Sequence, residues 1–181
     1  MGRELALSKR DDIFAATPPL ESLRFIASKA ARRQNSPDPK LNFLVMSNDV
    51  RRAYFYAPAK RPIYISIPAE DLENGDEDRV GVLNLSLYGT RDAASNWADA
   101  YSSRLVELGF RIGAASPCNF HHAGRDISVT VHGDDFTSCG TAANLKWLKQ
   151  GLEEKSRPWH LQPLLQRVRE GRRRGRSTLI T

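Results

Sequence analysis

Two adjacent carboxylates, Asp134 and Asp135, follow Gly133 at the end of a run in which apolar and polar residues alternate. Successive side chains of a β-strand point to opposite faces, so the apolar members of residues 127–132 can be buried together. Like charges at a hairpin tip repel each other unless a cation lies beside them, and a divalent metal is the usual cation. The pattern therefore indicates either a metal-binding hairpin tip or an ordinary Gly-Asp turn between two strands.

A third carboxylate, Asp49, follows a short apolar run. Residues 41–46 are bounded by turn residues, which predicts a buried strand that ends at Asp49. The chain order is then this strand, a helix, the hairpin and a second helix, which is a split βαβ arrangement. In that arrangement the end of the Asp49 strand lies beside the hairpin tip.

Together the three carboxylates would form the oxygen-rich cage that Mg²⁺ prefers, with positions left open for phosphates. Two such ions about 3.5–4 Å apart can activate an attacking hydroxyl and stabilise the leaving oxygen of an in-line phosphoryl displacement. This geometry is typical of nucleotidyl transfer.

Other elements follow from periodicity and turn residues. Thr17 can cap a helix whose first turn holds Pro18, and Thr141 can cap another. A helix from Asp92 to Leu108 is predicted between them, with Gly109 as its stop. The remaining predictions are strands at residues 63–67 and 83–89 and a hairpin over residues 118–126 that turns at Ala123-Gly124.

Two further groups of residues have metal-ligand chemistry. Cys118, His121 and His122 could bind zinc, but no second tight pair completes a tetrahedral set, so ordinary strand residues are favoured. Six acidic residues crowd residues 70–78 around an Asn-Gly pair. Their spacing is not enforced, which favours a solvated loop over a metal site.

The chain has 181 residues and a formal net charge of +6, and most of that charge is local. Residues 167–176 hold six Arg and one Glu, a local charge of +5, so the rest of the chain is close to neutral. This segment has two interpretations: a basic tail that contacts phosphates or serves as a nuclear signal, or a solvated tail without a partner.

Charged residues interrupt the first twelve positions, so no signal peptide is expected, and no apolar run is long enough to span a bilayer. The two cysteines, Cys118 and Cys139, are expected to be reduced. We therefore expect an intracellular protein of the cytoplasm or nucleus that is not secreted and has no membrane partner.

Ordered motifs give the sequence a recognisable resemblance. Residues 48–55 (Asn-Asp-Val-Arg-Arg-Ala-Tyr-Phe) match the motif Asp-Val-x-x-Ala-aromatic, and residues 85–97 match Ser-Leu-Tyr-Gly-Leu-Lys-Gln-Ala-Pro-Arg-x-Trp. Residues 116–120 match Asp-Pro-Cys-Leu-Tyr, and residues 132–135 stand in place of Tyr-Val-Asp-Asp. With residues 11–24 before them, these motifs resemble the reverse transcriptase of copia-type long-terminal-repeat retrotransposons over residues 11–152.

The resemblance implies an RNA-directed DNA polymerase that uses Mg²⁺ or Mn²⁺. Its catalytic and metal-binding carboxylates would be Asp49, Asp134 and Asp135, with the Val50 carbonyl as an additional metal ligand. Its partners would be an RNA or DNA template-primer, deoxynucleoside triphosphates, and polyprotein neighbours such as integrase and ribonuclease H.

The resemblance also implies a nucleotide site. Tyr54 would stack under the incoming sugar and exclude a 2′-hydroxyl, while Gly89 and Arg91 would line the nucleotide and template side. Tyr54 has an alternative interpretation as a core aromatic residue beside Phe55 and Tyr56.

Several positions depart from the family pattern. Asp92 stands where the family has Gln and is expected to repel phosphates, and Ala94 replaces Pro. His132-Gly133 replaces Tyr-Val, which removes an aromatic ring expected near the primer end. Finger strands before residue 11, and thumb, ribonuclease H and integrase segments after the matched region, are expected to be absent.

The prediction is therefore an α+β reverse-transcriptase palm, a split βαβ (ferredoxin-like) antiparallel sheet packed against helices. Residues 1–10 would be an N-terminal extension, residues 11–156 a partial reverse transcriptase with part of the fingers, and residues 157–181 a basic disordered tail. Two alternatives remain: an inactive retrotransposon relic that at most binds nucleic acid, and an unrelated α+β protein whose Asp pair is only a turn.

Overall fold

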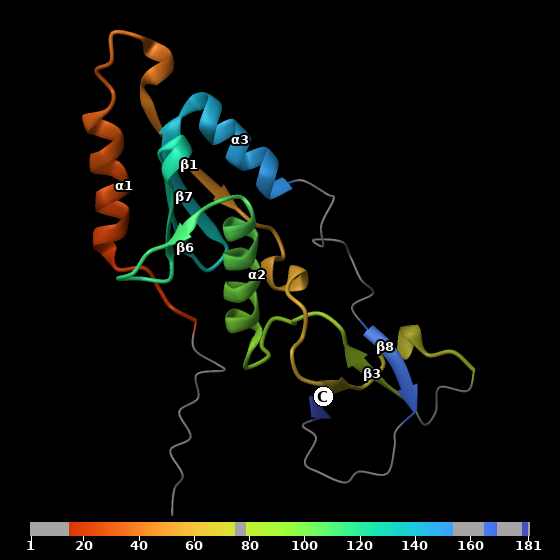
Figure 1. The fold of residues 1–181 in the computed structure, drawn as a ribbon. Helices are drawn as coiled ribbons and strands as arrows, with labels where there is room; N and C mark the ends of the chain where they lie inside the picture. The colour runs from red at the N-terminus through yellow and green to blue at the C-terminus, as the bar shows by residue number, and fades with distance from the viewer. Residues whose placement is uncertain (1–14, 75–78, 154–164, 170–178, 181) are drawn as a thin grey trace, which may run out of the picture.

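The computed structural model describes residues 15–74, 79–153, 165–169 and 179–180. Its main sheet has five strands in the order β1-β7-β6-β5-β4, and each described pair is antiparallel (Figure 1). β1 (Phe43–Asp49) and β4 (Arg111–Ile112) lie at its two edges. Between them lie β7 (Asp135–Thr141), β6 (Ile127–His132) and β5 (Asn119–His122).

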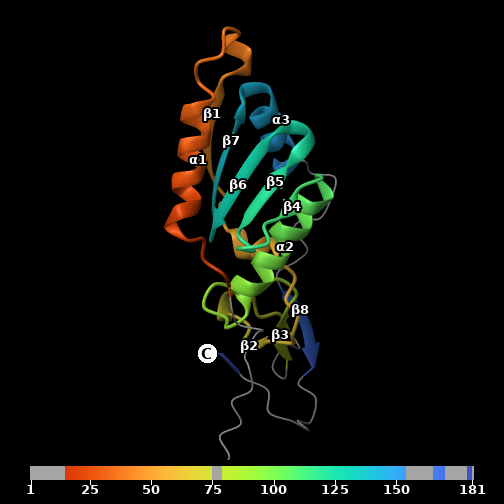
Figure 2. The ribbon, with the colours of Figure 1, turned by 60° about the vertical axis from the view of Figure 1, so that its left-hand side comes forward.

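Helices cover both faces of this sheet. α1 (Leu20–Arg32) lies on one side, and α2 (Ala93–Glu107) and α3 (Ala142–Glu153) lie on the other, as the two views in Figures 1 and 2 show. The molecule therefore has the mixed helix and antiparallel-sheet architecture that the α+β prediction requires.

The alternation predicted for residues 127–132 is confirmed by the packing of β6. Ile127, Val129 and Val131 are at most 2% exposed and belong to the main core, on the face that α2 and α3 cover. Ser128 and Thr130 point to the opposite face and are also buried, beneath α1. β6 is therefore a central strand with two covered faces.

A smaller cluster joins α1 to the sheet. Ile26 and Ala30 pack there against Phe43 and Cys139. An ion pair between Lys29 and Asp126, with 2.6 Å between Nζ and Oδ1, ties the same helix to the β5–β6 connection. These contacts fix α1 across β6, β7 and β1.

Two helix ends agree with the sequence prediction and one does not. α2 ends one residue before Leu108, and Gly109 adopts φ +90°, where a side chain would be strained. The Thr141 hydroxyl accepts a hydrogen bond from the backbone N–H of Asn144, so the predicted cap of α3 is present. The predicted cap of the first helix is wrong, because Pro19 occupies the N-cap position and supplies no side-chain hydrogen bond.

The strand predictions were less accurate. β1 contains the predicted core strand, but Leu44 and Val45 are 48% and 52% exposed, because an edge strand has a neighbour on one side only. The strand predicted at residues 83–89 lies earlier, as β3 (Arg79–Leu83), and Leu85 makes only an isolated bridge with Pro58. The hairpin predicted over residues 118–126 is confirmed by the pairing of β5 with β6.

A second sheet has the order β8-β3-β2-β9 and contains β8 (Leu165–Arg169), β2 (Tyr64–Ile65) and β9 (Leu179–Ile180). β8 and β9 fall within residues 157–181, and the domain boundaries stay predictions.

No helix among the described residues is long and apolar enough to cross a membrane. Short 3₁₀ helices occupy Pro39–Leu41, Ala53–Tyr56, Ala69–Asp71 and Ala123–Arg125.

Candidate active site

The predicted hairpin tip is the two-residue loop between β6 and β7. His132 pairs with Asp135 across the strands, so Gly133 and Asp134 form the loop. Gly133 has φ +63°, a left-handed backbone conformation that glycine adopts without strain. The first position of a tight hairpin turn needs such a conformation. The chain therefore changes direction where the two carboxylates begin.

α2 holds this turn in place. The indole Nε1 of Trp97 donates a hydrogen bond to the carbonyl oxygen of Gly133 over 2.8 Å, and the Trp97 side chain is almost completely buried. The contact between Trp97 and the turn was not predicted from the sequence. Its only sequence signal is an indole N–H on a buried face, which requires an acceptor.

The third carboxylate lies beside the hairpin, as predicted. Asp49 is directly opposite Asp135 in the β1–β7 register. One residue further, the backbone N–H of Val50 donates a hydrogen bond to the carbonyl oxygen of Asp134 over 3.0 Å. Directly opposed residues share a face of the sheet, so Asp49, Asp135 and His132 form one row across β1, β7 and β6.

The chemistry of this donor set fits a hard cation. Asp49, Asp134 and Asp135 are all exposed at one end of the sheet. Like charges at directly opposed strand positions are destabilising, and a bound cation would offset that repulsion. Among the described residues, however, no three His, Cys, Asp or Glu side chains are gathered into a group that could hold a metal ion. The carboxylates would have to move closer together to share one.

Aromatic residues follow Asp49 in the chain, in the 3₁₀ helix Ala53–Tyr56. Tyr54 stacks at a tilt on Tyr88, with 4.4 Å between ring centroids, and Phe55 meets the same ring edge-on at 5.6 Å. Tyr54 is half-buried and touches the main core, which agrees in part with its interpretation as a core residue. Its role toward a sugar stays a prediction.

Tyr88 is a site residue that the sequence did not single out. Its side chain is 47% exposed. Partial burial raises the pKa of Tyr88 above the ordinary tyrosine value, and the negative charge of Asp134 raises this pKa further. Tyr88 therefore lies within the electrostatic field of the hairpin tip.

The neighbouring turn carries two predicted nucleotide-side residues. Gly89 adopts φ +87°, and a Cβ built on it would meet nothing within 4 Å, so backbone conformation rather than space favours glycine there. Arg91 is exposed. Both lie close in the chain to Tyr88, and their nucleotide contacts stay predictions.

The expectation that Asp92 presents a repulsive charge to phosphates is corrected by the structure. Asp92 is 5% exposed, and its Oδ1 lies 3.1 Å from Nε of Arg61 in an ion pair. Its Oδ2 lies 3.4 Å from Nδ2 of Asn96. Since Arg61 compensates the charge and the side chain is buried, Asp92 does not present a free negative charge to phosphates.

The alternative zinc set does not form. The Cys118 thiol is buried and donates to the carbonyl oxygen of Ala16 over 3.1 Å. His121 Nδ1 lies 3.2 Å from the Ser128 hydroxyl, while His122 accepts a hydrogen bond from the backbone of Arg125. Because the three side chains have these separate partners, they form no zinc site. His121 and His122 are strand residues of β5, and Cys118 lies in the turn just before that strand. Of the acidic loop, residues 70–74 are exposed and residues 75–78 lie outside the described part.

A family of known proteins matches most of the chain. The model of the family described as "Reverse transcriptase (RNA-dependent DNA polymerase)" matches residues 4–164, so the chain belongs to this family. More narrowly, it is a reverse transcriptase domain of the copia type found in retrotransposons, which confirms the resemblance in the motifs.

A curated relative supports this assignment. The Transposon Ty1-NL2 Gag-Pol polyprotein of Saccharomyces cerevisiae (strain ATCC 204508 / S288c) is 33% identical over 66 residues, which is 36% of this chain. The matched segment is 4% of the length of that polyprotein, so the chain corresponds to a small part of it. No solved structure matches the chain.

Proposed function

We propose that the chain is the palm of a reverse transcriptase, in which Asp49, Asp134 and Asp135 carry template-directed addition of deoxynucleotides. The observation that carries this proposal is the direct pairing of Asp49 with Asp135 at the hairpin tip. The two residues are 86 positions apart in the chain, and the fold brings them to adjacent strands of one sheet edge.

The topology supports a split βαβ palm. β1 and β6 are both antiparallel to β7, so they run parallel to each other with β7 inserted between them. α2 lies in the connection from β1 to β6 and covers the core face of the sheet. A parallel pair divided by one strand of a hairpin supports the split arrangement that we propose.

The chain's own groups can hold the metal ions that the family uses. Asp49, Asp134 and Asp135 would supply carboxylate oxygens, and Val50 would supply its carbonyl oxygen, which are the ligands that Mg²⁺ and Mn²⁺ prefer. When bound, such ions activate an attacking hydroxyl and stabilise the leaving oxygen. The carboxylates would have to move closer together to share an ion, and the hydrogen bond from the Val50 N–H to the Asp134 carbonyl oxygen would keep the two backbones in register.

The nucleotide would lie against the aromatic pair. Tyr54 would present its ring to the sugar and exclude a 2′-hydroxyl, and Tyr88 would hold that ring in position through the 4.4 Å stack. Gly89 leaves the neighbouring surface open, and Arg91 would contribute a positive charge toward the phosphates or the template.

The partners of the site follow from the same proposal. They are an RNA or DNA template-primer and deoxynucleoside triphosphates, in an intracellular protein of the cytoplasm or nucleus. Integrase and ribonuclease H would be neighbours in a Pol polyprotein, whose overall activity would include DNA integration.

Primer extension on an RNA template with Mg²⁺ or Mn²⁺ tests the proposal. The purified chain is compared with the double variant Asp49→Asn, Asp134→Asn, and with Asp99→Asn on the exposed face of α2 as a matched control for lost charge. Extension that disappears only in the double variant supports catalysis at these carboxylates.

The second candidate is an inactive relic. One observation favours it: among the described residues, no three His, Cys, Asp or Glu side chains lie close enough together to hold a metal ion. It predicts a folded protein that shows no extension and binds no Mn²⁺ in a titration followed by electron paramagnetic resonance. Mn²⁺ binding that depends on Asp49, without extension, would instead indicate a competent metal site that lacks the rest of the polymerase.

A further inference from the structure

His132 ends β6 in the same row as two of the candidate metal-binding carboxylates. It is directly opposed to Asp135 on β7, and Asp135 is directly opposed to Asp49 on β1. Directly opposed residues share one face of an antiparallel sheet, so an imidazole and two carboxylates extend from the same face of three neighbouring strands. The family motif has tyrosine at this position, and a tyrosine ring has no nitrogen to offer a metal.

The hydrogen-bond pattern sets the spacing of the two carboxylates. The backbone N–H of Val50 donates to the carbonyl oxygen of Asp134, which makes these two residues a hydrogen-bonded pair. Hydrogen-bonded and non-hydrogen-bonded pairs alternate along an antiparallel ladder, so Asp49 and Asp135 form a non-hydrogen-bonded pair. Opposed Cα atoms are about 4.5 Å apart in such a pair, against about 5.5 Å in a hydrogen-bonded pair. The two carboxylates therefore leave their strands at the closer of the two spacings.

The three side chains of this row can turn toward one ion. Asp49, Asp135 and His132 are all exposed. No side-chain hydrogen bond or ion pair joins any of them to another residue that the structure describes. Since no metal-binding group is already gathered among the described residues, binding requires rotation between staggered side-chain conformations. The exposure of the side chains means that this rotation displaces no packed neighbour.

The mixed donor set decides which cation the row prefers. Carboxylate oxygen suits Mg²⁺, whereas imidazole nitrogen suits borderline ions such as Zn²⁺. Three protein ligands and one open position are the usual set at a catalytic zinc, with nitrogen and oxygen atoms about 2.0–2.2 Å from the metal. An imidazole in the row therefore adds more to the affinity for Zn²⁺ than to the affinity for Mg²⁺.

We propose that His132 is a third metal ligand beside Asp49 and Asp135, and that this row binds a borderline divalent cation such as Zn²⁺ in preference to Mg²⁺. One imidazole nitrogen binds the ion, and each carboxylate supplies an oxygen. The inference rests on the proposed function for the metal-binding role of the two carboxylates, and it adds the class of ion that the site selects.

Calorimetric titration of the full chain with Zn²⁺ tests the proposal. His132→Gln removes the imidazole but keeps a polar side chain at an exposed position, and it should weaken Zn²⁺ binding at least tenfold. Asp135→Asn should weaken it to a similar extent. In a large excess of Mg²⁺, the wild-type chain should still bind Zn²⁺ and His132→Gln should not. Equal Zn²⁺ affinities of the wild-type chain and His132→Gln, or loss of wild-type binding in Mg²⁺, overturns the proposal.

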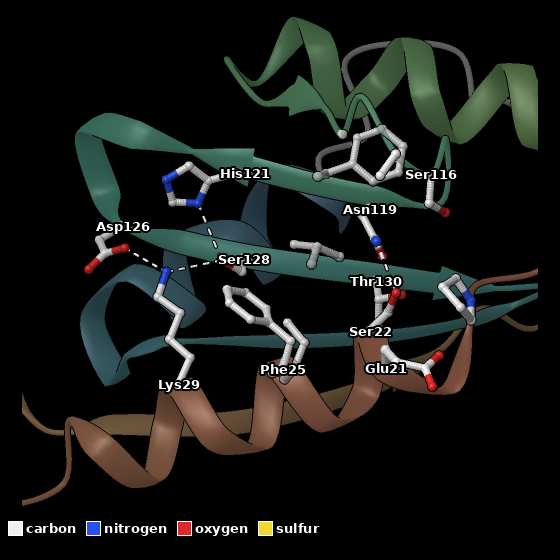
Figure 3. Close-up of a pocket in the computed structure, with 16 residues that line it drawn as sticks. Glu21, Ser22, Phe25, Lys29, Ser116, Asn119, His121, Asp126, Ser128 and Thr130 are labelled. Carbon is white, nitrogen blue, oxygen red and sulfur yellow. Dashed lines mark hydrogen bonds and ion pairs between the residues drawn. The ribbon is translucent and has the colours of Figure 1, made fainter.

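His121→Gln is the matched control, because it removes another exposed histidine from the same sheet. His121 is opposed to Ser128 near the start of β6, whereas His132 ends that strand. Figure 3 shows His121 beside Ser128, and its Nδ1 lies 3.2 Å from the serine hydroxyl. This variant should bind Zn²⁺ as the wild-type chain does. Binding that is lost in His121→Gln and kept in His132→Gln would locate the ion elsewhere and overturn the proposal.

Nuclear magnetic resonance of isotope-labelled histidine nitrogens identifies the ligand directly. Zn²⁺ should shift one imidazole nitrogen resonance that is missing from the spectrum of His132→Gln. If saturation with Zn²⁺ leaves that resonance in place, His132 is not a ligand.

The result can be separated from that of primer extension. Mg²⁺-dependent extension with no Zn²⁺ effect on His132 would overturn this inference and leave the proposed function standing. Zn²⁺ binding that depends on His132 and Asp135, in a chain that shows no extension, would support this inference and count against the proposed function.

Discussion

The indole nitrogen of Trp97 and the carbonyl oxygen of Gly133 are joined by a hydrogen bond of 2.8 Å between residues 36 positions apart. This bond connects the packing of α2 to the shape of the turn that carries Asp134. Trp97 also meets Phe136 edge-on, with 6.4 Å between centroids, so the same side chain contacts both ends of the turn. The position of the hairpin tip therefore depends on a core residue.

Trp97→Phe should lower the free energy of unfolding by about 2 kcal/mol, because it removes this hydrogen bond and leaves a small cavity. Urea unfolding measures the change. Trp147→Phe is the control, since Trp147 is only half-buried and packs on Arg125 and His122 instead of on the turn between β6 and β7. If Trp97 supports the turn, Trp97→Phe should also weaken Mn²⁺ binding, and Trp147→Phe should not. Equal losses of stability in the two variants, with weaker Mn²⁺ binding in Trp147→Phe only, would contradict this support.

The facing carboxylates of β1 and β7 lead to a second prediction. Asp49→Asn should raise the free energy of unfolding by about 0.5 kcal/mol at low salt in the presence of a chelator, because it relieves repulsion from Asp135. Adding Mn²⁺ should reverse the order, since only the wild-type protein gains stability from binding the ion.

A double-mutant cycle separates this repulsion from other effects. If Asp49 and Asp135 repel each other, Asp135→Asn should stabilise the wild-type protein and have no such effect once Asp49 is Asn. Chemical denaturation of the four proteins gives the coupling free energy. A coupling of zero at low salt would show that the two carboxylates do not sense each other.

Tyr88 leads to a prediction about alkaline pH. Partial burial, followed by the charge of Asp134, raises the pKa of Tyr88 in the folded state. The folded protein therefore keeps this proton where the unfolded chain has lost it, so the stability it contributes is complete below about pH 10 and is lost as the pH rises through the raised pKa.

Ultraviolet titration of tyrosinate absorbance measures this pKa, in a Tyr101→Phe background because burial also raises the pKa of Tyr101. Asp134→Asn should lower the pKa of Tyr88 only partway toward the ordinary value, since partial burial is the larger cause. Glu107→Gln, an exposed charge at the far end of α2, should leave it unchanged. An unchanged pKa in Asp134→Asn would contradict the electrostatic effect of Asp134 on Tyr88.

Local patterns predicted the parts of this fold that depend on local physics. Alternation identified β6, and an apolar run next to turn residues identified β1 and placed Asp49 at its end. Together with the chain order, these were enough to place Asp49 beside the hairpin. The exposure of Leu44 and Val45 was missed because it depends on β1 being an edge strand, which residues 41–46 do not encode.

Two of the errors have a common physical cause, which is a long-range partner. Asp92 was expected to show its charge to phosphates, and Arg61, which precedes it by 31 positions, buries and compensates that charge. The alternating residues from 83 to 89 read as a strand, but only Arg79–Leu83 finds strand partners, in β2 and β8. A sequence pattern records which side chains are apolar, and it does not record which backbone will be available to pair with them.

His132 gives the last prediction, because it stands in the row with Asp135 and Asp49 where the family has tyrosine. The side chain is exposed, so His132→Tyr should change the free energy of unfolding by less than about 0.5 kcal/mol. If an aromatic ring at this position packs near the primer end, the variant should extend a primer severalfold faster than the wild-type chain, with a lower KM for template-primer. Steady-state extension at varied template-primer concentration measures both quantities. His132→Leu is the control for size and lost polarity, and an equal gain in both variants would assign the effect to removing the imidazole from beside the carboxylates instead of to the ring.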